Sequence, residues 1–274
     1  MAINDVSLSS GMRSNLLSLQ DTVNLLNRTQ NRLSTGKKVN SAIDNPVSFF
    51  AAQALTSRAG VIDSLKDAMG QAVQTIQAAD KGIKAITAMI EQAKGIAQSA
   101  QSATAGSTEM TSLQNQYNTL RTQLTELAED SGYRGKNLLN SDVMTVTFEG
   151  ATLAVTGFAA TAGGLSITAA DWASTYAATV SAAITADIGL LDTALNTLRS
   201  ESSKMSGNLS IITVRQDFSS NMINVLTEGS DKLTLADTNE EGANMLMLQT
   251  RQSLSTTALS LSAQAAQSVL RLFG

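Results

Sequence analysis

The apolar residues of the chain recur in alternating steps of three and four, the pattern of helices that pack lengthwise against other helices. The most regular run covers residues 62–100, and one of its heptad positions holds Ile62, Met69, Ile76, Ile83, Ile90 and Ala97. Thirty-nine residues of helix make a rod of about 58 Å. Gly70, Gly82 and Gly95 lie off this stripe. Because glycine weakens a helix, we expect a neighbouring helix to approach closely there.

Two more segments continue this pattern. One has an apolar face from Leu113 to Leu127, and the other has a stripe from Ile184 to Leu226 that is followed by a break over 229–237. The short Gly106-Ser107 interruption favours an antiparallel return of the chain. We therefore predict an antiparallel helical bundle with a core that includes Ile62, Ile76, Ile83, Ile90, Leu120, Leu191 and Leu198.

Both ends of the chain are also predicted to be helical. The first helix runs from Met12 to Gly36, and the last, from Ala243 to Phe273, carries apolar residues on two adjoining faces. Such a helix needs more than one neighbour. Two lone helices bury little surface, so the ends should stay frayed in a monomer and should order when repeated copies cover them in a head-to-tail filament. The predicted polymerisation interface consists of Leu16, Leu19, Val23, Leu26, Leu33, Leu254, Leu259, Leu261, Val269 and Leu272.

A short β-rich segment interrupts the helices. Residues 143–148 show the two-residue alternation of a β-strand, with Met144, Val146 and Phe148 on one face. Glu149-Gly150 is a typical turn sequence, and residues 151–156 are again of types that favour strands. Residues 165–168 are a possible third strand. The predicted fold is mainly α, with a small β-hairpin insertion and paired terminal helices. The expected domains are a terminal helical domain (1–45 plus 235–274), a helical bundle (46–140 plus 175–234) and a small outer segment (141–174).

Composition narrows the function. The 274 residues include one proline and no cysteine or histidine, so thiolate sites, a histidine general base and a serine–histidine triad are excluded. We expect no enzyme activity, no cofactor and no metal. A net charge of −4 argues against nucleic-acid binding. Within residues 1–40, however, basic residues outnumber acidic ones. No cleavable signal peptide and no apolar stretch of 18 residues are evident, so we also expect no membrane insertion.

The ends carry a family resemblance. Residues 32–44, Arg-Leu-Ser-Thr-Gly-Lys-Lys-Val-Asn-Ser-Ala-Ile-Asp, resemble the R-L-S-S-G-x-R-I-N-S-A-x-D stretch of bacterial flagellins, and residues 263–272 resemble the A-N-Q-x-P-Q-x-V-L-x-L ending. Gly135-Lys136-Asn137-Leu138-Leu139 is similar to the entry to the flagellin hairpin. The sequence departs from the pattern at Asn45-Pro46-Val47 and at Ala266. The match indicates a short flagellin with almost no outer domain.

The resemblance implies an extracellular filament subunit for swimming motility, secreted without a cleaved signal. Its implied partners are many identical copies, the flagellar export apparatus, an export chaperone, and hook-associated and cap proteins. One alternative is a hook–filament junction protein, and another is a coiled-coil signalling or adhesin module. Some flagellins carry an immune-receptor region that corresponds here to Gln92, Lys94 and Ile96. Because Gln92 and Gly95 replace an arginine and a glutamate of that motif, we expect no strong recognition.

Overall fold

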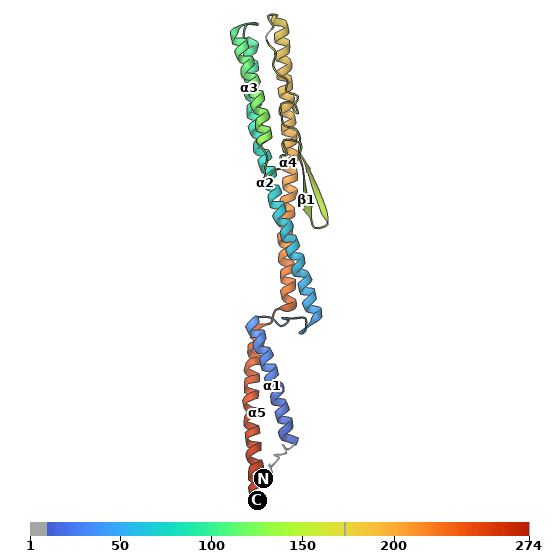
Figure 1. Ribbon diagram of the computed structural model, residues 1–274, viewed down its shortest axis with the longest axis vertical. Helices are drawn as coiled ribbons and strands as arrows, with labels where there is room; N and C mark the ends of the chain where they lie inside the picture. Colours follow the sequence, from blue (N-terminus) through green and yellow to red (C-terminus); the bar gives the residue numbers. More distant parts are fainter. Residues whose placement is uncertain (1–9, 173, 274) are drawn as a thin grey trace. The chain divides into compact units, whose positions relative to one another are not determined.

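The computed structural model describes residues 10–172 and 174–273 (Figure 1). The elements, in chain order, are α1 (Ser10–Thr35), α2 (Pro46–Ser102), α3 (Thr108–Asp130), β1 (Val143–Phe148), β2 (Ala151–Thr156), α4 (Ala177–Thr234) and α5 (Thr238–Phe273). The mainly α fold with one β-hairpin and paired terminal helices is confirmed.

The chain divides into two compact units. The terminal unit contains Met1–Arg58 and Val225–Gly274, and the central unit contains Ala59–Asn224. The long helices α2 and α4 each contribute to both units. Each unit is described separately below.

In the central unit, α2 and α4 run antiparallel beside α3 (Figure 1). Polar contacts show the direction: Lys94 Nζ lies 2.5 Å from Asp192 Oδ1, and Ser202 Oγ donates to Asp80 Oδ1 over 3.3 Å. Residue numbers rise on α4 as they fall on α2. The structure buries every residue of the first heptad position from Ile62 to Ala97. Among the residues expected in the bundle core, it also buries Leu191 and Leu198 and leaves Leu120 half-buried.

The expected close approach of a neighbouring helix is found at none of the three glycines, although the segment that follows α3 crowds Gly82. A Cβ on Gly82 would lie 2.5 Å from Leu139 Cδ1 and 2.9 Å from Ser131 Cβ, so no larger residue fits without movement. Gly95 has open space, and a Cβ on Gly70 would make an ordinary 3.7 Å contact with Gln216. Close packing therefore explains Gly82 alone.

One predicted helix boundary is wrong, and the possible third strand is absent. Helix α4 continues through Gly229 and ends only at Thr234, so the break covers three residues, 235–237. A Cβ at 229 would lie 3.4 Å from Leu55 Cδ1, at the short limit of ordinary van der Waals contact, so α2 packs against α4 at this glycine. Residues 165–168 form no strand: Ser166 has a φ of 59°, and the amides of Leu165 and Ile167 close turns onto the 161–162 carbonyls.

The hairpin pairs β1 and β2 antiparallel, from Val143 opposite Thr156 to Phe148 opposite Ala151. Gly150 takes a φ of 82° in the two-residue turn, a region that glycine enters at little cost. Alternation sends Val146, Phe148 and Val155 into the core. The guanidinium of Arg215 on α4 stacks 5.2 Å from the Phe148 ring centroid, which ties the hairpin to the helix.

A polar cluster in the core joins the loop after the hairpin to α3 and α4. Trp172 is fully buried, packs 5.2 Å from the Tyr117 ring and donates its Nε1–H to Asp187 Oδ2 over 2.9 Å. Thr168 Oγ1 donates to the other Asp187 oxygen over 3.0 Å. The Tyr117 hydroxyl is buried without a hydrogen-bond partner. Burial, and secondarily the Asp187 charge, raises the pKa of Tyr117.

Replacing Tyr117 with phenylalanine should therefore leave the free energy of unfolding unchanged or raise it by up to about 1 kcal/mol. The change removes a desolvated hydroxyl and keeps the ring contact with Trp172. Urea unfolding followed by circular dichroism measures the effect. A loss of more than about 1 kcal/mol would show that the hydroxyl has a partner after all.

The expectation that no stretch is apolar enough to span a membrane is too strict. Helix α4 contains an 18-residue window with a mean hydropathy of 1.3. The apolar score comes partly from small residues, and the side chains of Val180, Ile184, Leu191 and Leu198 are buried in the central core. Of this window, 33% is buried inside the protein, and the core helix of a bundle passes the same test of length and composition.

Candidate assembly surface

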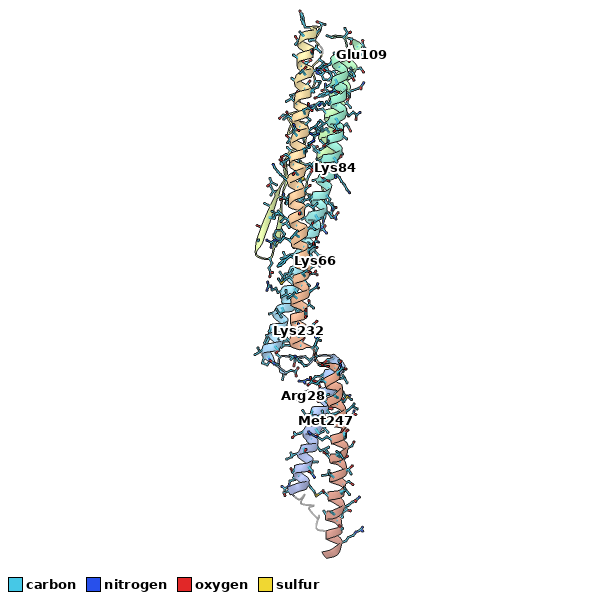
Figure 2. All side chains as sticks on the ribbon, turned by 180° about the vertical axis from the view of Figure 1, so that it is seen from behind. Arg28, Lys66, Lys84, Glu109, Lys232 and Met247 are labelled. Carbon is cyan, nitrogen blue, oxygen red and sulfur yellow. The ribbon has the colours of Figure 1, made fainter. Side chains whose placement is uncertain are left out.

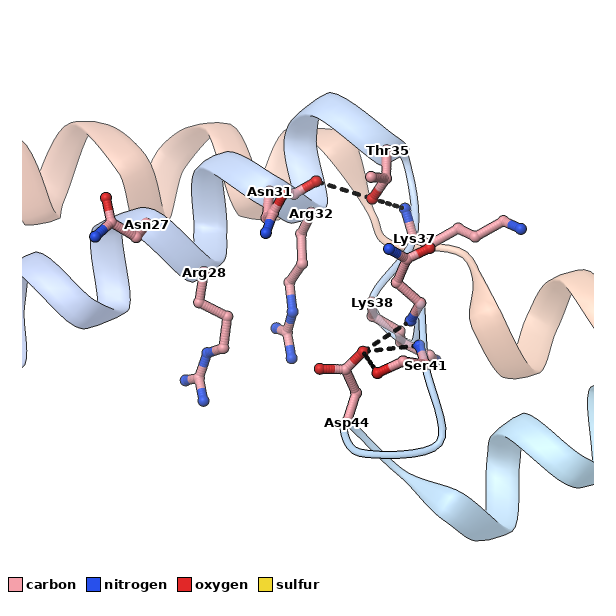
Figure 3. A pocket seen from close by; sticks show the side chains of 10 residues that line it. Asn27, Arg28, Asn31, Arg32, Thr35, Lys37, Lys38, Ser41 and Asp44 are labelled. Carbon is pink, nitrogen blue, oxygen red and sulfur yellow. Dashed lines mark hydrogen bonds between the residues drawn. The ribbon is translucent and has the colours of Figure 1, made fainter.

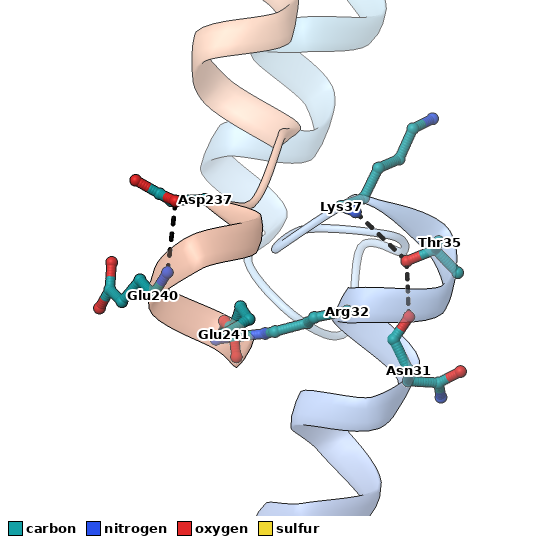
Figure 4. A network of polar contacts seen from close by, with 7 residues as sticks. All are labelled: Asn31, Arg32, Thr35, Lys37, Asp237, Glu240 and Glu241. Carbon is teal, nitrogen blue, oxygen red and sulfur yellow. Dashed lines mark hydrogen bonds and ion pairs between the residues drawn. The ribbon is translucent and has the colours of Figure 1, made fainter. Parts of the chain in front are cut away.

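Helices α1 and α5 pair antiparallel in the terminal unit, and an ion pair joins the end of one to the start of the other. Arg32 Nη1 lies 2.9 Å from Glu241 Oε1, as Figure 4 shows. The Glu241 side chain is nine-tenths buried, and its Oε2 has no hydrogen-bond partner. Removing Arg32 would leave this carboxylate buried and unpaired, which would destabilise the terminal unit.

Few side chains are fully buried between α1 and α5. Thr22 and Thr29 are the buried residues of the described part of α1, and Leu248 is the buried apolar residue on the described part of α5. The predicted interface residues that lie half-buried are Leu16, Leu19, Val23, Leu26 and Leu259. Two helices that cover each other so incompletely have little apolar surface to hold them together.

An apolar stripe lies outside the contact between α1 and α5. Met247, Leu254 and Leu261 recur every seven residues on α5 and are 53%, 66% and 61% exposed. We call these three residues the outer stripe. Leu33 on α1 is 37% exposed. The side chains of Val269 and Leu272, also predicted for the interface, lie outside the described ones. The structure thus separates the two predicted faces of α5: one meets α1, and the other is open.

The connectors on either side of the helix pair are joined by backbone hydrogen bonds. Gly36 ends α1 with a φ of 69°, as expected for the residue after a helix. The amides of Lys38 and Val39 donate to the Thr234 carbonyl, and the Ala236 amide donates to the Gly36 carbonyl over 2.9 Å. This short ladder holds the end of α1 beside the start of α5.

Side-chain caps begin the helices that follow the connectors. Asn45 Oδ1 accepts from the Ser48 amide at the start of α2, as its position before Pro46 predicts. Asp237 Oδ1 accepts from the Asn239 amide at the start of α5. Phe49 and Phe50 in the first turn of α2 pack edge to face with centroids 5.6 Å apart, and the Phe50 side chain is largely exposed.

Asp44 organises the loop before α2. Its Oδ2 accepts from the amides of Ser41 and Asn40 at 2.9 and 3.0 Å and from the Ser41 hydroxyl at 3.1 Å. The backbone hydrogen bonds from Ser41 and Asn40, with the hydroxyl bond, lower the Asp44 pKa below its ordinary value of 3.8. The bonds favour the ionised form.

Acid should therefore loosen this loop. A lowered folded-state pKa gives stabilisation that is present above pH 3.8 and is lost as the pH falls through the folded value. Hydrogen exchange at the Asn40 and Ser41 amides, corrected for intrinsic rates, should accelerate below pH 3.8. Asp44→Asn is the control, and its protection factors should not change over this range. Unchanged protection in the wild type at pH 2 would contradict the assignment.

The described residues contain no group of three or more His, Cys, Asp or Glu residues that could hold a metal ion.

In the region that corresponds to the immune-receptor motif of some flagellins, Gln92 is exposed and Ile96 packs against the core. Lys94 is engaged by Asp192.

Comparison with known proteins decides the family. The model for the bacterial flagellin N-terminal helical region matches residues 3–143, just over half of the chain. The chain belongs to the bacterial flagellin family. Flagellin FljM of Caulobacter vibrioides is 29% identical over 277 residues, and flagellin FljK of the same organism is 28% identical over 273 residues, with full coverage of both chains in each case. Flagellin C of Rhizobium meliloti is 30% identical over 86 residues, which are 31% of this chain and 27% of that protein.

A crystal structure of Bacillus cereus flagellin is also similar, at 17% identity and a TM-score of 0.46 over 57% of this chain and 88% of that one. The family assignment does not depend on this likeness. This flagellin is a structural subunit of the extracellular flagellar filament and not an enzyme. The comparisons give no support to the hook–filament junction alternative.

Proposed function

We propose that this flagellin polymerises through its terminal unit, which other copies complete. The outer stripe carries the proposal. Three large apolar residues repeat every seven positions on a helix whose opposite face already meets α1. A heptad repeat is the seam of a helix packed along another helix, and the described part of the terminal unit offers no second helix to cover it.

The energetics favour assembly over a stable isolated pair. A fully buried leucine contributes about 1.5–3 kcal/mol relative to an exposed one. Leu248 is the one apolar residue that the described part of α5 buries to this extent, whereas the central unit buries a continuous core along α2, α3 and α4. The helices α1 and α5 therefore fray in the monomer and become ordered when neighbouring copies cover the outer stripe. The central unit remains folded throughout.

The family also suggests how the subunit reaches the filament. It passes through the flagellar export apparatus with an export chaperone and without a cleaved signal, and it meets hook-associated and cap proteins at the filament ends. A terminal unit that is only marginally stable alone suits passage as an unfolded chain.

Electron microscopy of the purified protein tests the proposal. Short sonicated filaments serve as seeds for fresh monomer, and the controls are monomer without seeds and seeds alone. Long filaments that lengthen with added monomer support polymerisation. A bounded ring or a complete absence of growth would instead favour a junction protein.

A further inference from the structure

A basic pocket of about 330 Å³ lies in the terminal unit where α1 ends and the loop to α2 begins (Figure 3). Its ten lining residues include four cations, Arg28, Arg32, Lys37 and Lys38, and one carboxylate, Asp44. Figure 3 shows Arg28 and Arg32 extending from α1 toward the side on which Asp44 lies. The chain as a whole has a net charge of −4, so this concentration of positive charge is local.

The cations of this pocket are incompletely neutralised by the chain itself. Arg32 pairs with Glu241, and Lys38 Nζ donates to the Lys232 carbonyl over 3.2 Å. The guanidinium of Arg28 has no hydrogen bond or ion pair with any described residue. Asp44 Oδ2 already accepts hydrogen bonds from two backbone amides and a hydroxyl. The pocket therefore offers unsatisfied donors and excess positive charge.

We propose that this pocket receives carboxylate side chains from a second copy of the chain, and that the contact helps to set the register of neighbouring subunits. The inference rests on the filament function. A polymer holds its copies beside one another, so a carboxylate of a neighbouring copy reaches the pocket at a high effective concentration. Arginine binds carboxylates through paired N–H donors, which gives orientation as well as attraction.

The start of α5 supplies such carboxylates. Glu240 is exposed and its side chain has no partner among the described residues. Figure 4 shows Glu240 directed away from Arg32, while its neighbour Glu241 points toward it. A contact between Glu240 of one copy and the pocket of the next joins two different groups, so it is a head-to-tail contact. Such a contact leaves both groups available at the ends of a growing polymer.

Charge reversal at both groups tests the proposal. Arg28→Glu and Glu240→Arg should each raise the critical concentration for seeded growth by about tenfold or more, the effect expected from losing a close interfacial charge pair. The double variant Arg28→Glu/Glu240→Arg should return it to near the wild-type value. Lys84→Glu on the surface of α2 (Figure 2) is the control for Arg28→Glu, because it lowers the net charge equally, at an exposed side chain outside the terminal unit whose ion pair is with Asp80.

The outcomes separate this inference from the filament function. Wild-type growth by both single variants would overturn the pocket assignment and leave filament formation intact. Weakened single variants without rescue in the double variant would overturn the pairing with Glu240 of a second copy. Failure of the wild-type chain to elongate seeds would instead count against polymerisation itself. Circular dichroism melts of each variant establish that the central unit remains folded.

Discussion

Replacing Leu261 with aspartate should abolish filament growth while leaving the thermal melt of the monomer nearly unchanged. Leu261 is 61% exposed in the isolated chain, so a charge there costs little before assembly. In a filament the same position would be buried against another copy, and an unpaired carboxylate would lose the leucine burial and incur a desolvation cost of several kcal/mol. Because every subunit carries the change, the penalty recurs at every step of growth.

Seeded growth followed by light scattering and electron microscopy measures this effect. Leu261→Met is the matched control, since it keeps the position apolar at similar volume and should assemble within a few-fold of the wild type. Leu33→Asp, at a less exposed position of α1, should act in the same direction. Wild-type filaments from Leu261→Asp at the wild-type critical concentration would show that the outer stripe is not an assembly surface.

Replacing Trp172 with alanine should lower the free energy of unfolding of the central unit by about 3–5 kcal/mol. The change empties a fully buried site beside Tyr117 and removes the indole donor from the buried Asp187 carboxylate. Urea unfolding followed at 222 nm, with seeded growth in parallel, measures stability and assembly on the same samples.

The control Trp172→Phe separates the two contributions. It retains most of the packing but leaves Asp187 with the single hydroxyl bond from Thr168, so it should cost about 1.5–3 kcal/mol. Equal stability of Trp172→Phe and the wild type would show that the indole hydrogen bond contributes nothing. Equal stability of Trp172→Ala would show that the cluster is not part of the core.

Regular periodicity made the central helices predictable. Between Ile62 and Ala97 the same position of every heptad is apolar. This one pattern predicts that the segment is helical, which face of the helix packs inward, and which residues are buried. The hairpin was predictable for a similar reason, because alternation and the Glu149-Gly150 turn agree. Residues 165–168 have the composition of a strand, but the left-handed backbone of Ser166 turns the chain away from pairing.

Long-range polar contacts were not predictable. Asp187 is an acid among apolar neighbours in the sequence, and the structure buries it and pairs it with the Trp172 indole. Its position three residues after Ile184 and four before Leu191, both buried, was the available signal. Likewise, two apolar faces on α5 gave no indication of which one meets α1. The face of α5 that meets α1 is the one beside the Arg32–Glu241 ion pair, and this pair joins residues 209 positions apart in the sequence.

Hydrogen exchange of the terminal helices in monomer and filament tests the central claim most directly. Monodisperse protein and sedimented filaments are labelled at the same pH and temperature, and peptides covering 10–35 and 238–268 are compared with peptides from 62–100. The account predicts little protection of the terminal helices in the monomer, strong protection in the filament, and equal protection of the central helix in both. Full protection of both terminal helices in the monomer would contradict it.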